Sequence, residues 1–225
     1  GLLDFVHSPN RLQTPEYRAP SEVELYADGV HIATAAYEKG DLTLDTEKVN
    51  TLEATAHYDR GRFTGDLHVY HSWYDGFIDE RATGETFLFE EENEEFPVYQ
   101  FTQTDAKFYG FELEGAYALW QEGDRKLSLE GSADYVHAQT DFGPAARIPP
   151  YSLTGRLAWT STMFDVSGEV RHVGEQDRVA NEFELPTDDY TLVNASVAVR
   201  PFAQRNVTLF AEARNLTDEE ARAVA

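Results

Sequence analysis

Cysteine is absent from the 225 residues of the chain. Proteins exported through an oxidising periplasm often avoid cysteine, so its absence favours export. The sequence also lacks any run of about 18 apolar residues, which excludes a membrane-spanning helix. Gly1 to Asn10 has neither the basic stretch nor the long apolar run of a signal peptide. The sequence therefore indicates either a processed chain or an internal piece of a longer protein.

Basic residues are few. The chain has 18 Lys and Arg against 41 Asp and Glu, a net charge of -23, which argues against a nucleic-acid partner. Aromatic residues nevertheless make up 13% of the chain, more than an acidic disordered chain would have. A folded, acidic protein is expected.

From Glu47 onward apolar and polar residues alternate with period two, as in Leu52, Ala54 and Ala56 against Glu53 and Thr55. Each alternating segment has about 10 to 12 residues, the length that a tilted strand needs to cross a bilayer. The expected strands are residues 47–58, 62–73, 108–120, 126–138, 150–160, 164–174, 190–201 and 206–215.

The gaps between these strands are alternately short and long. Short gaps fall at 59–62, 121–125, 161–163 and 202–205, and long gaps at 74–107, 139–150 and 174–189. This parity is typical of outer-membrane barrels, which have short periplasmic turns and long external loops. In the longest gap, residues 87–89 and 98–101 flank an acidic run and are expected to extend a hairpin beyond the membrane.

The two faces of each expected strand differ in kind. The polar face carries too many charges for a dry core and suits a wet or plug-filled lumen. Counting back from a Tyr58–Phe63 pair at the first tight turn places Glu53 beside His68 on this lumen face. The aliphatic residues expected to face lipid are Leu67, Leu113, Leu129, Leu157, Val170, Val197 and Leu209.

Several short segments resemble motifs of TonB-dependent outer-membrane receptors, in the family's order. The segment 18–26 (RAPSEVELY) is similar to the family's "RAPT…ELY" passage, and 29–48 is similar to its "G-x-H-x-A-T … E-x-G-N-x-x-L-x-P-E-K" passage. The others are 108–114, similar to "G-x-E-x-E", 147–150, similar to "R-x-P-x-x", and 213–218, similar to "V-x-N-L-x-D". The resemblance covers about residues 18 to 218. Residues 1 to 17 fit less well, because Pro9 and Pro15 would break a strand leading into Arg18.

The resemblance implies an all-β fold: the C-terminal portion, about eight strands, of an antiparallel up-and-down transmembrane β-barrel. The chain reads as a single partial barrel domain, residues 1–225. Within it, 1–46 is a poorly assigned segment and external loop, 47–215 holds the barrel strands, and 216–225 is a loop before a missing final strand. The plug domain and the TonB box of the family are not visible, so a fragment is expected.

By the same resemblance, the function is uptake of a scarce nutrient across the bacterial outer membrane. The expected partners are outer-membrane lipid, a small extracellular ligand, and TonB acting through a plug. The cargo stays open between zinc, an iron–siderophore chelate, cobalamin and a sugar, with the 18–48 passage favouring a zinc-type receptor. A passive porin or structural barrel is the alternative, and an outer-membrane enzyme comes third.

One metal site is a candidate. His31 lies in an expected external loop with Asp28 and Asp41 nearby in sequence, and imidazole with carboxylate can bind zinc. An ordinary polar loop is the simpler interpretation. No resident cofactor is expected, and neither a nucleophile elbow nor a phosphate-binding glycine loop occurs.

Overall fold

The computed structural model describes residues 4–5, 15–89, 93–180, 185–202 and 207–221. In this part of the chain, thirteen strands form one sheet, and the single helix, α1 (Glu22–Tyr26), has five residues. No helix in the described ranges is long and apolar enough to cross a membrane. Each long strand pairs antiparallel with the next along the chain, so the all-β, up-and-down prediction is confirmed.

Eight strands form the wall of this sheet, and their bounds follow the period-two pattern. They are β5 (Glu47–Arg60), β6 (Phe63–Phe89), β7 (Glu94–Glu122), β8 (Arg125–Thr140), β10 (Ser152–Thr160), β11 (Phe164–Val173), β12 (Tyr190–Val199) and β13 (Leu209–Ala213). All eight expected strands are therefore present, and β13 is shorter than expected. The short gap at 202–205 lies largely outside the described residues.

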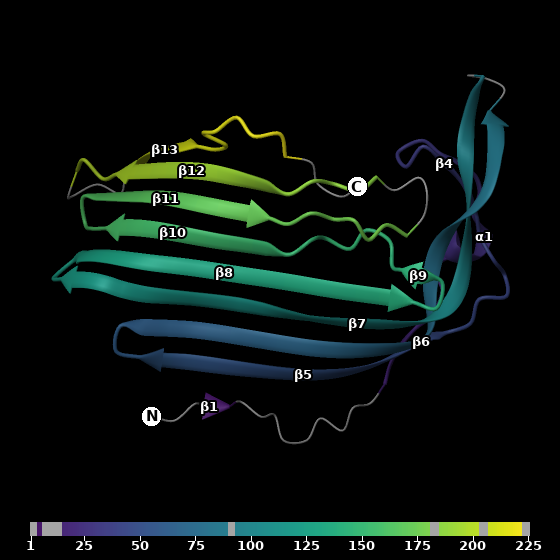
Figure 1. The fold of residues 1–225 in the computed structure, drawn as a ribbon, viewed down its shortest axis with the longest axis horizontal. Coiled ribbons are helices and arrows are strands. Elements are labelled where there is room, and N and C mark those ends of the chain that lie inside the picture. Colours follow the sequence, from purple (N-terminus) through teal and green to yellow (C-terminus); the bar gives the residue numbers. More distant parts are fainter. Residues whose placement is uncertain (1–3, 6–14, 90–92, 181–184, 203–206, 222–225) are drawn as a thin grey trace.

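The main departure from expectation is the long gap at 74–107, most of which is strand rather than loop. β6 and β7 continue as a hairpin past Trp73, through register shifts at Tyr74/Phe77 and Ala82/Thr86. Figure 1 shows the tight turns at one end of the sheet and, at the other, this hairpin bending across the strand ends. The apolar segments 87–89 and 98–101 lie in it, as the sequence indicated.

The register between β5 and β6 corrects one prediction. Arg60 pairs with Phe63 across a two-residue turn, because Gly61 adopts the positive φ of 66° that such a turn needs. Relative to a four-residue turn this slides the pairing by two positions, so Glu53 opposes Tyr70 and not His68. The expected Glu53–His68 pair is wrong, although a slip of two leaves both residues on the expected face.

The N-terminal region is more regular than expected. β1 (Asp4–Phe5) and β2 (Glu16–Arg18) both pair antiparallel with β5, so a short strand does lead into Arg18. Beyond it come α1, β3 (Asp28–His31) and β4 (Ala36–Lys39), while β9 (Gly143–Pro144) pairs with the end of β8.

The apolar face is exposed, as a lipid-facing wall requires. All seven residues expected to face lipid have exposed side chains, from 38% for Leu67 to 62% for Leu209. Aromatic rings gather towards both ends of this face. Trp120 and Trp159 stack at 5.5 Å near the tight turns, and Tyr109 lies towards the other end. Two aromatic belts with aliphatics between them are typical of a barrel wall in a bilayer.

We expect Leu113→Arg to destabilise the full-length receptor in lipid by about 2 to 4 kcal/mol, because it puts a charge near mid-membrane. Leu113 lies between Leu67 and Ala133 in the sheet. Urea unfolding in vesicles measures the effect. Ser132→Arg is the matched control, since Ser132 pairs with Glu114 on the lumen face. Equal losses from both variants would show that the face assignment is wrong.

Candidate functional site: the external cap and the lumen wall

The segment between β2 and β5 folds against the β6–β7 hairpin extension, and we call the described residues of the two together the external cap (residues 18–47, 75–89 and 93–106). Figure 1 shows α1 and β4 beside the hairpin, at the end of the sheet opposite the tight turns. β4 pairs in parallel with β7, Tyr37 with Val98 and Lys39 with Gln100. Long connections mark the external side of such a barrel, so the cap lies where an external ligand arrives.

The helix α1 begins at a capping box. The Ser21 hydroxyl accepts a hydrogen bond from the Glu24 amide at 3.3 Å, and the Ser21 amide donates to the Glu24 carboxylate at 2.6 Å. Gly40 crosses the end of this helix so closely that a Cβ there would lie 2.5 Å from the Leu25 carbonyl carbon. Only glycine allows this approach, and its amide donates to the Ala27 carbonyl at 2.7 Å.

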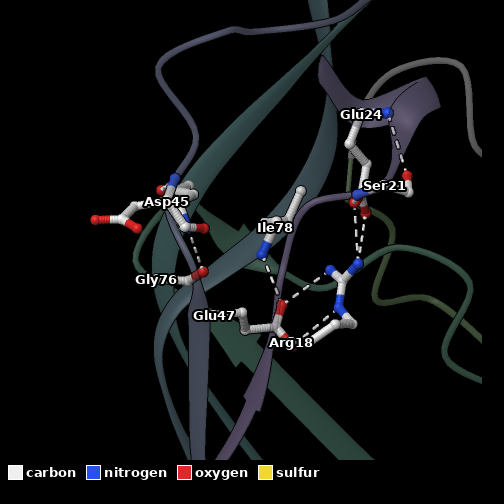
Figure 2. Close-up of polar contacts among 8 residues, drawn as sticks. Arg18, Ser21, Glu24, Asp45, Glu47, Gly76 and Ile78 are labelled. Atoms are coloured by element: carbon white, nitrogen blue, oxygen red, sulfur yellow. Dashed lines mark hydrogen bonds and ion pairs between the residues drawn. The ribbon is translucent and has the colours of Figure 1, made fainter. Parts of the chain in front are cut away.

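The Glu47 carboxylate is the polar centre of the cap, and its residue is only 6% exposed. It accepts from Arg18 Nη2 at 3.1 Å and Nε at 3.4 Å, and from the Ile78 amide at 3.0 Å (Figure 2). Arg18 Nη1 also donates to both Glu24 oxygens, at 2.9 and 3.0 Å. Hydrogen bonding to Glu47 is the main reason that the pKa of Arg18 is raised. This lock (Arg18, Glu24, Glu47 and the Ile78 amide) ties β2, α1, β5 and β6 together.

Two glutamines of β7 hold the same segment from the other side. Gln103 Nε2 donates to the Asp45 and Gly76 carbonyls, both at 2.8 Å, and its Oε1 accepts from the Asp45 amide at 2.8 Å. Gln100 Nε2 donates to the Gly40 carbonyl at 2.9 Å. These glutamine side chains thus form hydrogen bonds with backbone N–H and C=O groups of the cap that are not paired in the β-sheet.

Glu80 is a second charged group inside the cap, with its side chain only 20% exposed. Its Oε1 is buried and has no hydrogen-bond partner among the described residues, while Oε2 lies 3.8 Å from Arg147 Nη2. Burial raises the pKa of Glu80, and the nearby Glu38 carboxylate raises it further, although Arg147 opposes the shift.

The residues of the predicted zinc site have separate partners. His31 Nδ1 lies 3.0 Å from Glu38 Oε1, Asp28 accepts from the Tyr37 hydroxyl at 2.8 Å, and Asp41 accepts from the Thr43 amide at 2.8 Å. Across the described ranges, no group of three or more His, Asp or Glu side chains is arranged to hold a metal ion. The zinc site stays a prediction.

An aromatic cluster that the sequence analysis missed lies on the lumen face below the cap. The ring centroids of Tyr74, Phe77 and Phe108 are 5.1 to 5.3 Å apart. Phe108 pairs with Ser72, whose hydroxyl contacts Thr51 on the polar face of β5. Aromatic residues at polar-face positions could have indicated this cluster. The register shift between Tyr74 and Phe77, however, prevents the period-two pattern from assigning Phe77 to a face.

Farther towards the tight turns, the lumen face is hollowed and acidic. A hollow of about 330 Å³ crosses β6 to β11, and one cation, Arg156, stands among its carboxylates. Arg156 Nη1 lies 3.7 Å from Glu130 Oε2. Beside the hollow, His57 Nδ1 lies 2.6 Å from Asp66 Oδ1. The acidic residues that line the hollow are Asp66, Glu114, Glu130 and Glu169.

Together, the lipid-facing wall, polar lumen and external cap define a segment of an outer-membrane type of β-barrel. Residues 16–216 match the family described as TonB dependent receptor-like, beta-barrel, and the chain belongs to that family. The family consists of outer-membrane receptors and transporters rather than enzymes.

Solved structures of such receptors share the fold. The copper transporter OprC is similar with a TM-score of 0.73 and 19% identity over 91% of this chain. The siderophore receptor PirA from Acinetobacter baumannii gives 0.61 and 14% over 91%, and a variant of the ferric enterobactin receptor PfeA from Pseudomonas aeruginosa gives 0.55 and 16% over 90%. The chain spans only 30%, 34% and 31% of those three proteins, respectively.

We expect Glu47→Ala to loosen the cap, because it leaves Arg18 and the Ile78 amide without their buried acceptor. The free energy of local opening should fall by about 1 to 3 kcal/mol. Hydrogen exchange of residues 20–46 in the full-length receptor measures it. Glu22→Ala in the same helix is the control, and unchanged exchange in Glu47→Ala would contradict the lock.

The raised pKa of Glu80 predicts a pH dependence of the cap. The folded state holds this proton more tightly than the unfolded chain, so local stability falls as pH rises from the ordinary glutamate pKa, about 4.3, through the raised value. Glu80→Gln should remove that fall and slow exchange in the hairpin at neutral pH. Exchange corrected for its intrinsic pH dependence tests this, with the exposed Glu95→Gln as control. An unchanged profile in Glu80→Gln would contradict the prediction.

Proposed function

We propose that the full-length protein is a TonB-dependent receptor of the bacterial outer membrane that takes up a scarce metal as an ion or a chelate. Membership of the receptor family is the observation that carries this proposal. The ordered cap supports it, because a receptor for a dilute ligand needs a shaped external surface, whereas a passive pore needs only a passage.

The aromatic cluster favours an organic metal chelate as cargo. A catecholate chelator surrounds its metal with aromatic rings, which pack well against rings such as Tyr74, Phe77 and Phe108. These rings lie on the lumen face next to the lock, so a ligand passing the cap would meet them. A bare zinc ion is the competing cargo, and it depends on the predicted site at His31, Asp28 and Asp41.

The acidic hollow supports a plug in the lumen. Four carboxylates around Arg156 give that part of the wall an excess of negative charge, which suits a partner surface with Lys or Arg. In the proposed mechanism, TonB pulls a plug that rests on this wall, and the ligand then passes. The alternative, a passive porin, needs neither the plug nor energy coupling.

Uptake of metal chelates by cells carrying the full-length gene tests the proposal. We expect a labelled ferric catecholate to enter these cells, and uptake to stop when TonB is deleted. Uptake that persists without TonB would favour the passive porin.

Phe108→Ala should weaken binding of that chelate by about fivefold or more, because truncating a contacting aromatic typically costs more than about 1 kcal/mol. Phe111→Ala is the matched control, since Phe111 lies on the same strand but on the apolar face. Equal binding by wild type and Phe108→Ala, alongside TonB-dependent uptake, would reject the aromatic cluster as the ligand surface while leaving the receptor function standing.

A further inference from the structure

Two cations lie at the external edge of the apolar face, around Gln139. Trp73 pairs with Lys107, and Lys107 pairs with Gln139, so these three residues form one row across β6, β7 and β8. The side chains of this row point outward. Lys107 lies an even number of residues from the lipid-facing Leu113 on β7, and Gln139 lies an even number from the lipid-facing Leu129 on β8, so each shares the face of that leucine. Arg178 reaches the same row from the connection between β11 and β12.

Arg178 is held in place by three contacts. Its Nη1 lies 2.8 Å from His137 Nδ1, and its Nη2 donates to Gln139 Oε1 at 2.9 Å and to the Ala138 carbonyl at 3.4 Å. A guanidinium can only donate, so His137 Nδ1 is the acceptor. The Tyr109 ring stacks on His137 at 4.6 Å. The guanidinium is therefore fixed, and two of its five N–H groups remain for another acceptor.

Among the described residues, Lys107 and Arg178 form no ion pair with a carboxylate, although the chain has 41 acidic residues for 18 basic ones. The acidic residues Asp105 and Asp141 lie two residues beyond Lys107 and Gln139, respectively, on the side away from the membrane. The Asp105 carboxylate accepts a hydrogen bond from the Gly76 amide at 3.4 Å.

We propose that Lys107, Gln139 and Arg178 bind the phosphate of an anionic lipid in the outer leaflet, and we call these three residues the phosphate patch. The apolar wall directly below, with Tyr109 and Tyr135, offers acyl chains a continuous surface, which a soluble anion would not use. Basic side chains at the membrane boundary attract phosphate head groups, and the N–H groups of Arg178 that remain can donate charge-assisted hydrogen bonds to phosphate oxygens. The inference rests on the outer-membrane location in the proposed function, but not on transport.

Titration of the detergent-solubilised full-length receptor with purified lipid A, followed by native mass spectrometry, tests the patch. We expect Lys107→Ala and Arg178→Ala each to weaken lipid A binding by about fivefold, as expected for losing one cation near a head group. Arg178→Lys should keep part of the affinity, and dephosphorylated lipid A should bind wild type and variants equally. Lys107 is exposed, so its variant tests the patch even if Arg178→Ala misfolds.

Arg125→Ala is the matched control. Arg125 lies on the same face of β8 as the lipid-facing Leu129, but at the end of the strand opposite the phosphate patch. Equal weakening by Arg125→Ala and Arg178→Ala would mean that only net charge matters and would overturn the proposal. Displacement of lipid A by an equal concentration of inorganic phosphate would also overturn it. Ligand uptake by the wild-type receptor is measured in parallel. If the wild type binds lipid A through the phosphate patch but takes up no ligand, only the transport function is rejected.

Discussion

Continuous antiparallel pairing from β5 to β12 is the constraint on which the rest of the structure depends. In a bilayer no water is available for backbone polar groups, so each strand must find its partners in its neighbours. Once that ladder is fixed, period two assigns every side chain to lipid or to lumen. Turn geometry then sets the details: one glycine, Gly61, moves the β5–β6 register by two positions without moving any residue across the sheet.

The ladder meets the cap at Glu47, the first residue of β5. Its backbone pairs with Arg18 of β2, and its carboxylate binds both the Arg18 guanidinium and the Ile78 amide, just past the register shift where the hairpin leaves the wall. A buried carboxylate is stable only with such charged and amide donors around it. Glu47 therefore helps to set the position of the cap relative to the barrel wall, together with Gln100 and Gln103 on the other side of the same segment.

The family motifs gain a physical reason from these contacts. Arg18 and Glu47 begin and end the capped segment, and Ser21 caps its helix. Gly40 is needed where the chain crosses the Leu25 carbonyl, and Gly110 where a Cβ would lie 2.3 Å from the Tyr135 carbonyl oxygen. Asn215 takes a positive φ of 51° and accepts from the Glu219 amide at 2.9 Å, closing the turn after β13.

How far the sequence predicts this arrangement depends on the range of the interactions. Period-two alternation is local, so the eight wall strands and their lipid-facing residues could be predicted, and the bounds differ mainly where pairing continues past the membrane. Register depends on turn geometry, and the cap depends on contacts such as Asp45 with Gln103, 58 residues apart, which no local pattern reveals. Glu80 was missed for the same reason, whereas Glu38, only seven residues from His31, was missed because its contact depends on the β3–β4 hairpin.

Neighbouring residues of one strand serve opposite surfaces of the wall. Lys107 points to the lipid side beside Gln139, while Phe108, the next residue, joins Tyr74 on the lumen side. A slip of one residue in β7 would place the cation in the aromatic cluster and the ring at the head groups. The lipid boundary and the proposed ligand surface are thus coupled through the register of a single strand. The long ladders that β7 forms with both β6 and β8 hold that register, so the sheet fixes both surfaces at once.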